Sequence, residues 1–174
     1  MAWIKTIAFS EATGKLKELY KQVVGFNNSV DNVVMMHSLR PHTLEAHLSL
    51  YRAVLHHADN TLPRWYLEAL GSYVSYLNNC NYCFTHHSRG MQRELGSQLK
   101  SEQLLKAIRE DSFKSTFLTH KEILGFQYAR SLTKDPSKMD SKLILEMRES
   151  EIPDSEILEM NQVISYFAYV NRTV

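Results

Sequence analysis

Apolar residues recur at helical spacing along almost the whole of this 174-residue chain. Leu16, for example, is followed by Leu19 and Tyr20, three and four residues on, as on one face of a helix. The chain has only 6 Gly and 4 Pro, and no segment alternates apolar and polar residues as a strand does. We therefore expect an all-α fold of about seven or eight helices, forming one domain over residues 1–174.

Helix-start signals support this expectation. Thr119 and Glu122 have the spacing of a capping box, in which each side chain bonds the other residue's backbone amide. The pair Asn78–Asn79 interrupts the apolar spacing, and either asparagine can cap a new helix that begins near Cys80. The break allows the chain to fold one helix back on the other.

The charge balance excludes several classes of protein. Lys and Arg number 20 and Asp and Glu 19, so the formal net charge is +1. This argues against nucleic-acid binding and membrane binding through bulk positive charge. No apolar run approaches the roughly 20 residues of a spanning helix, and the first residues lack the features of a signal peptide. We expect a cytoplasmic protein.

The most informative segment contains both cysteines. On a helix starting near Cys80, the thiols of Cys80 and Cys83 share one face, and His87 lies one further turn along the same stripe. His86 points about 60° away from Cys83. The first turn of a helix has free N–H groups and a positive dipole end, and a nearby imidazole can accept a thiol proton. This setting favours a reactive thiolate with a second thiol within bonding reach.

Three interpretations of this pair remain open. Redox chemistry is favoured, because a thiolate beside a second thiol can attack a peroxide or disulfide and then close an intramolecular disulfide. Metal binding is less favoured, since the spacing does not match common zinc sites and one straight helix cannot surround a metal. An inert pair of small core residues is the third. The redox interpretation requires no metal and no organic cofactor.

A carboxylate that orients His87 would complete such a site. Glu94 lies on the same stripe of the same helix, two turns from His87. Glu68 lies in the preceding apolar helix and can approach His87 only if the chain folds back at Asn78–Asn79. The spacing of residues does not choose between these two carboxylates.

The pattern Glu68-x11-Cys80-x2-Cys83-x3-His87 resembles the signature of the AhpD-like alkylhydroperoxidases, within the carboxymuconolactone decarboxylase superfamily. The flanking residues look like its peroxidase-related branch. These flanking matches are Trp3–Ile4, Glu11–Ala12, Gly14, Leu16, Arg40–Pro41, Val74–Ser75, Asn78, Tyr82, His86 and Asn171–Arg172.

The resemblance implies a helical fold that assembles as trimers or hexamers. It also implies that Cys83 is the peroxidatic thiol, Cys80 the resolving thiol, and His87 a proton relay backed by Glu68. Founding alkylhydroperoxidases have a histidine where this chain has Tyr82, and a phenol is a poor base at neutral pH. We treat Tyr82 and His86 as auxiliary candidates.

The sequence therefore predicts a thiol-dependent reductase of hydroperoxides that uses an external thiol or dithiol. The alternatives are a thiol–disulfide oxidoreductase and a non-catalytic, redox-sensing oligomer of the same fold. The cysteine pair argues against lactone decarboxylation, because the decarboxylases of the superfamily do not use it. The segment Val163–Val170 is apolar nearly all round, so it is either a core helix or part of a subunit interface. With the resemblance, it leads us to expect a homo-oligomer.

Overall fold

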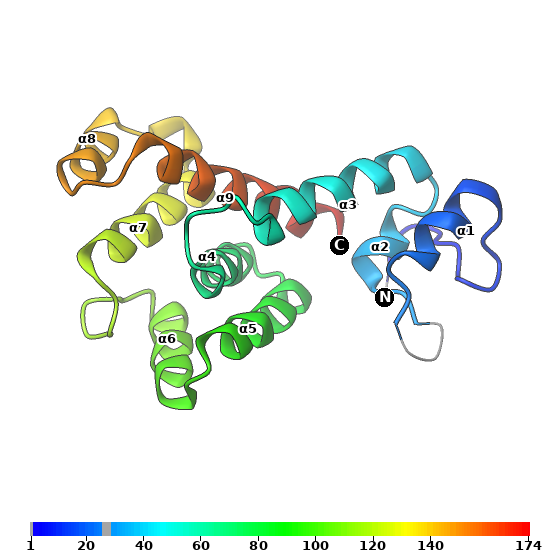
Figure 1. The fold of residues 1–174 in the computed structure, drawn as a ribbon, viewed down its shortest axis with the longest axis horizontal. Helices are drawn as coiled ribbons and strands as arrows, with labels where there is room; N and C mark the ends of the chain where they lie inside the picture. Colours follow the sequence, from blue (N-terminus) through cyan, green and yellow to red (C-terminus); the bar gives the residue numbers. More distant parts are fainter. Residues whose placement is uncertain (1, 26–28) are drawn as a thin grey trace. The chain divides into compact units, whose positions relative to one another are not determined.

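The computed structural model describes residues 2–25 and 29–174 of the chain (Figure 1). Over these residues it contains nine α-helices and no strand, which confirms the all-α class and exceeds the expected number of helices by one or two. The helices are α1 (Gly14–Lys21), α2 (Asn32–Met36), α3 (Pro41–His56), α4 (Arg64–Leu77), α5 (Asn81–Leu95), α6 (Gln98–Glu110), α7 (His120–Lys134), α8 (Ser141–Glu149) and α9 (Asp154–Thr173), with a short 3-10 helix, η2 (Pro136–Lys138), after α7.

The chain divides into two compact units. One contains residues 1–53 and 172–174, and the other contains residues 54–171. All the candidate site residues lie in the second unit. A single domain over the whole chain stays a prediction. None of the described helices combines the length and the apolar character that a membrane-spanning helix needs.

The first unit has its own apolar core. The predicted helical face of α1 is buried, and it belongs to one cluster with Leu44 and Leu48 of α3. Tyr20 is fully buried, and its hydroxyl donates a hydrogen bond to the carbonyl oxygen of Ile7 at 2.8 Å. A buried phenol needs such a partner, so this bond fixes the segment before α1 against the helix.

Two histidines stack inside the first unit. The rings of His37 and His47 have centroids 4.4 Å apart, and His47 is 5% exposed. Burial, and secondarily the charge of His37, lowers the pKa of His47 from 6.5 to about 4. His47 is therefore neutral in the folded protein over a pH range in which the unfolded chain protonates it.

We expect this histidine to weaken the fold in mild acid. Between pH 6.5 and 4, His47 is protonated in the unfolded chain and neutral in the folded protein. The free energy of unfolding therefore falls as the pH falls. The contribution at pH 4.5 is roughly 2–3 kcal/mol. Urea unfolding of His47→Phe should show a correspondingly flatter pH dependence over this window. A slope equal to that of the wild type would contradict the assignment.

Helix α4 is the centre of the second unit. Nearly every residue from Tyr66 to Leu77 is buried, and α4 packs against α5, α6 and α7. A helix that is buried on all sides must be apolar or small on all sides, as this sequence is. Gly71 and Gly125 leave room for the rings of Phe167 and Tyr66, respectively. α4 can therefore present a polar side chain only where a partner satisfies it.

The final helix is covered largely by the chain itself. Most of the apolar segment of α9 is buried, including Tyr166 and Phe167, whereas Tyr169 is 43% exposed. The core interpretation therefore accounts for this segment without a second subunit.

The predicted capping box at the start of α7 is confirmed. The backbone amide of Glu122 donates to the Thr119 hydroxyl at 3.3 Å, and the Thr119 amide donates to the Glu122 carboxylate at 2.6 Å. The carboxylate also lies at the positive end of the helix dipole. The start of α7 is thus specified locally.

Candidate active site

The turn between α4 and α5 positions the cysteine pair. The amide of Cys80 donates to the carbonyl of Ser75 at 2.9 Å, and the amide of Asn79 donates to that of Tyr76 at 3.0 Å. Asn79 has a φ of 57°. This combination is a Schellman motif, in which a left-handed residue ends a helix. The two helices then fold back and pack against each other, an arrangement that the break in apolar spacing allowed but did not determine.

The expectation that Asn78 or Asn79 caps α5 is wrong. Helix α5 begins at Asn81 with Cys80 in the capping position, and no side chain accepts a capping bond there. Asn79 adopts the left-handed backbone conformation that terminates α4, which differs from the extended conformation of most capping residues. The positive end of the α5 dipole therefore lies near the two sulfur atoms, where it stabilises negative charge.

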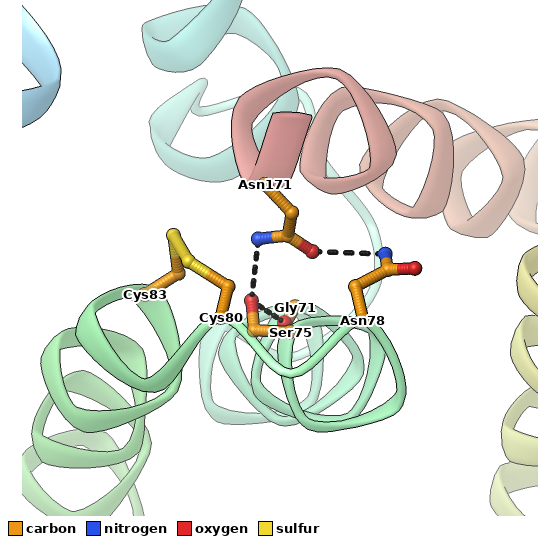
Figure 2. The surroundings of a disulfide bond; sticks show 6 residues. All are labelled: Gly71, Ser75, Asn78, Cys80, Cys83 and Asn171. Atoms are coloured by element: carbon orange, nitrogen blue, oxygen red, sulfur yellow. Dashed lines mark hydrogen bonds between the residues drawn. A yellow bond between two sulfur atoms is a disulfide. The ribbon is translucent and has the colours of Figure 1, made fainter. Parts of the chain in front are cut away.

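A disulfide joins Cys80 and Cys83, whose Cα atoms are 5.4 Å apart (Figure 2). Cys83 lies in the first turn of α5 and is 2% exposed, whereas Cys80 is half-buried. As whole residues, the two cysteines thus differ in exposure, and Cys80 is the more exposed one.

His87 and Glu68 form a buried pair one helical turn beyond Cys83. The distance from His87 Nδ1 to Glu68 Oε2 is 2.7 Å, and the side chains are 10% and 4% exposed. A carboxylate only accepts, so we assign Nδ1 as the donor, which leaves Nε2 as an acceptor. Of the two carboxylates that the sequence left open, Glu68 is the one that contacts His87.

Glu94 has other partners. Its carboxylate lies 3.3 Å from Nε of Arg93 and 3.8 Å from Nε of Arg64. These are partly exposed ion pairs of small energetic value. Glu94 therefore makes its ion pairs with two arginines rather than with the imidazole.

Apolar and small residues enclose the buried pair. The ring of Phe167 meets that of His87 edge to face, with centroids 4.5 Å apart. Gly90 faces the carboxylate of Glu68, and a Cβ atom there would lie 2.8 Å from both Cδ and Oε1. Nothing in the sequence pattern marks Gly90, because its importance comes from the packing of α4 on α5.

We expect Gly90→Ala to displace the Glu68 carboxylate. Alanine adds about 1 kcal/mol of helix propensity, but overpacking a close contact costs about 1–3 kcal/mol. The variant should lose stability in urea unfolding, and the Glu68–His87 hydrogen bond should lengthen in a crystal structure. Gln92→Ala, exposed on the same helix, is the matched control. A variant with wild-type stability and an intact hydrogen bond would contradict this account of Gly90.

His56, at the C-terminal end of α3, is a neighbour of this pair that the sequence did not single out as functional. Burial and the charge of Arg64 lower its pKa, and the carboxylate of Glu68 acts in the opposite direction. Its charge also interacts with that of His87. Proximity of this kind arises from the tertiary fold and leaves no spacing pattern in the sequence.

The auxiliary candidates lie on the outer side of α5. Tyr82 is half-buried and His86 is exposed, and their rings are stacked with centroids 6.4 Å apart. The ring of His86 is 5.0 Å from that of His87. Catalytic roles for Tyr82 and His86 stay predictions. In the described part of the chain, no three His, Cys, Asp or Glu residues group so that they could hold a metal ion.

Of the comparisons with known proteins, the one with solved structures identifies the fold. No protein-family model matches the chain, and no curated protein does. The solved structures that match include three proteins of 16–18% identity to this chain. An uncharacterised peroxidase-related protein from Ralstonia eutropha JMP134, described as an alkylhydroperoxidase AhpD core, has a TM-score of 0.80, 16% identity, and coverage of 97% of this chain and 86% of its own.

The other two are similar to this chain at 18% identity. An uncharacterised peroxidase-related protein from Silicibacter sp. TM1040 has a TM-score of 0.75 and coverage of 90% of this chain and 78% of its own. The debrominase Bmp8, in complex with 2,3,4-tribromopyrrole, has a TM-score of 0.76 and coverage of 99% and 88%. The fold implied by the sequence signature is confirmed: this chain has the all-α fold of the AhpD-like peroxidase-related proteins.

Proposed function

We propose that this protein reduces hydroperoxides with electrons from an external dithiol, through Cys83 and Cys80. The observation that carries the proposal is the Cys80–Cys83 disulfide at the start of a helix, one turn from a buried histidine hydrogen-bonded to a carboxylate. A thiol pair, a base and a group that orients the base are the parts that such a reaction needs.

In the proposed first step, Nε2 of His87 takes the proton of the Cys83 thiol. The thiolate attacks the hydroperoxide ROOH, an S–O bond forms and the O–O bond breaks. The leaving alkoxide receives the proton from His87, so the products are Cys83 sulfenic acid and the alcohol ROH. Glu68 holds the imidazole in the required tautomer and stabilises its protonated form.

The thiol of Cys80 then attacks the sulfenic acid, which forms the disulfide and releases water. A dithiol reductant restores the enzyme. Its thiolate attacks the sulfur of Cys80, the more exposed cysteine, Cys83 leaves as a thiolate beside His87, and the second reductant thiol displaces Cys80. Each cycle thus moves two electrons from the dithiol to one hydroperoxide.

Steady-state consumption of tert-butyl hydroperoxide with dithiothreitol tests the proposal. We expect saturable turnover by the wild type and none above background by a Cys80→Ser, Cys83→Ser double variant. If the disulfide cycles with dithiothreitol but no peroxide is consumed, the thiol–disulfide oxidoreductase or redox-sensing alternative replaces the proposal. The feature that favours the thiol–disulfide oxidoreductase alternative is the partial exposure of Cys80, because an external thiol must reach one of the two sulfur atoms.

Reductive debromination is a second candidate, favoured by the fold match to the debrominase Bmp8. Replacing bromine by hydrogen on an aromatic ring consumes two electrons, which the reduced cysteine pair supplies by forming its disulfide. The reaction converts an aryl bromide and two thiols into the arene, HBr and the disulfide. Bromide release from 2,3,4-tribromopyrrole by the reduced protein, at a rate above that of peroxide reduction, would make this the better assignment.

Assembly as a trimer or hexamer, in the cytoplasm, also stays part of the proposal. The exposed Tyr169 on α9 offers some apolar surface for such contacts. Analytical ultracentrifugation of the wild type at micromolar concentration should show the assembled species. A single 20.2 kDa component would contradict the expected assembly.

A further inference from the structure

Asn171 of α9 contacts the turn that carries the cysteine pair at two points (Figure 2). Its Nδ2 donates to the hydroxyl of Ser75 at 3.0 Å, and its Oδ1 accepts from Nδ2 of Asn78 at 3.0 Å. Ser75 belongs to the last turn of α4, and Asn78 follows the end of that helix. One amide therefore bridges both sides of the helix terminus.

The bridged residues also determine where Cys80 lies. Ser75 is fully buried, and its hydroxyl donates a hydrogen bond to the carbonyl of Gly71 at 2.8 Å. The oxygen of the same hydroxyl accepts a hydrogen bond from the side-chain amide of Asn171. The carbonyl of the same Ser75 accepts from the amide of Cys80. Asn171 thus connects through Ser75 to the backbone of the first cysteine.

We propose that Asn171 is a positioning residue, which fixes the turn in the geometry where the two sulfur atoms meet and so favours the disulfide over the dithiol. This inference rests on the proposed function only in that it treats the cysteine pair as redox-active. Asn171 acts through Ser75 and Asn78, and the proposal assigns it no contact with the hydroperoxide.

The physical basis is the effective concentration of one thiol at the other. Closing a disulfide restricts the reduced turn to one arrangement, and a turn already held in place loses less entropy on closure. Each hydrogen bond to Asn171 is worth about threefold in an equilibrium constant, so losing both is expected to lower the equilibrium constant for disulfide closure about tenfold. For a two-electron couple, a tenfold change corresponds to about 30 mV.

The test measures the equilibrium between the protein disulfide with two glutathione molecules and the protein dithiol with oxidised glutathione. Alkylation and mass spectrometry give the two protein forms. Asn171→Ala should become reduced at about tenfold lower values of [GSH]²/[GSSG] than the wild type. The matched control is Asn161→Ala, since Asn161 also lies on α9 and donates to the hydroxyl of Tyr128 at 2.8 Å. A merely structural loss would affect stability in both variants and leave the redox equilibrium unchanged.

A second variant keeps the test decisive if Asn171→Ala does not fold. Asn78→Ala removes the hydrogen bond between Asn78 and Asn171 without changing Asn171. We expect this variant to become reduced at values of [GSH]²/[GSSG] about threefold lower than the wild type. Where both fold, the effects in the double variant should be less than additive, because the two residues share a bond. An unchanged equilibrium in the folded variants would overturn the role of Asn171. Peroxide is absent from this measurement, so failure of the peroxidase proposal would appear only in the turnover assay.

Discussion

Cys83→Ser is expected to abolish hydroperoxide turnover, by about 10³-fold or more, because the thiolate that attacks the O–O bond is gone and serine is a far weaker nucleophile at neutral pH. The measurement is steady-state peroxide consumption with dithiothreitol. Serine is close in size to cysteine, so circular dichroism and urea unfolding of the reduced proteins should show little change.

Cys80→Ser is the matched control for this variant. It keeps the attacking thiol and removes the resolving one, so a single turnover should consume one peroxide per chain and leave a sulfenic acid on Cys83. A dimedone adduct mapped to Cys83 would show this product. If Cys83→Ser instead retains the single turnover and Cys80→Ser loses it, the first cysteine is the nucleophile and the proposed order is reversed.

Glu68→Gln and His87→Ala are each expected to slow peroxide reduction by about 10²-fold, the usual scale for a positioned acid–base group. Glutamine removes the charge that stabilises protonated His87 while nearly preserving volume. Alanine at position 87 removes the base itself. Turnover numbers, with unfolding curves for each variant, separate a catalytic loss from a loss of folded protein.

Glu94→Gln is the control for the carboxylate. Glu94 lies on the same helix as His87 but makes its ion pairs with Arg93 and Arg64, so its loss should leave the turnover number within about twofold of the wild type. Wild-type activity in Glu68→Gln together with inactivity in Glu94→Gln would exclude the proposed relay.

The sequence predicted the elements of this fold because most of their determinants are local. Apolar spacing and the Thr119–Glu122 box depend on residues within one or two turns, and both are confirmed. The nearness of Cys80 to Cys83 also follows from helical geometry alone. Helical geometry did not show which carboxylate, Glu68 or Glu94, contacts His87, because that depends on how closely α4 and α5 pack.

Other features of the site depend on contacts that spacing does not reveal. Gly90 matters because Glu68 approaches it from another helix, and Asn171 is 93 residues from the asparagine that it contacts. The Asn78–Asn79 pair correctly indicated a break, but not that Asn79 ends α4 in a left-handed conformation. A capping residue and a helix-terminating residue draw on the same small set of amino acids, so composition alone does not distinguish them.

The double duty of Cys80 has a consequence for protein engineering. The backbone amide of Cys80 makes the hydrogen bond that ends α4, and Cys80 is also the capping residue of α5. The four residues from Cys80 to Cys83 therefore cannot be transferred to another protein on their own. Inserting or deleting one residue after Cys80 would rotate the rest of α5 by about 100° relative to it, and His87 would no longer face Glu68. A designer who wished to install this chemistry in another scaffold would need to graft the whole helical hairpin, from Glu68 through Gly90, together with a third segment to supply the amide of Asn171.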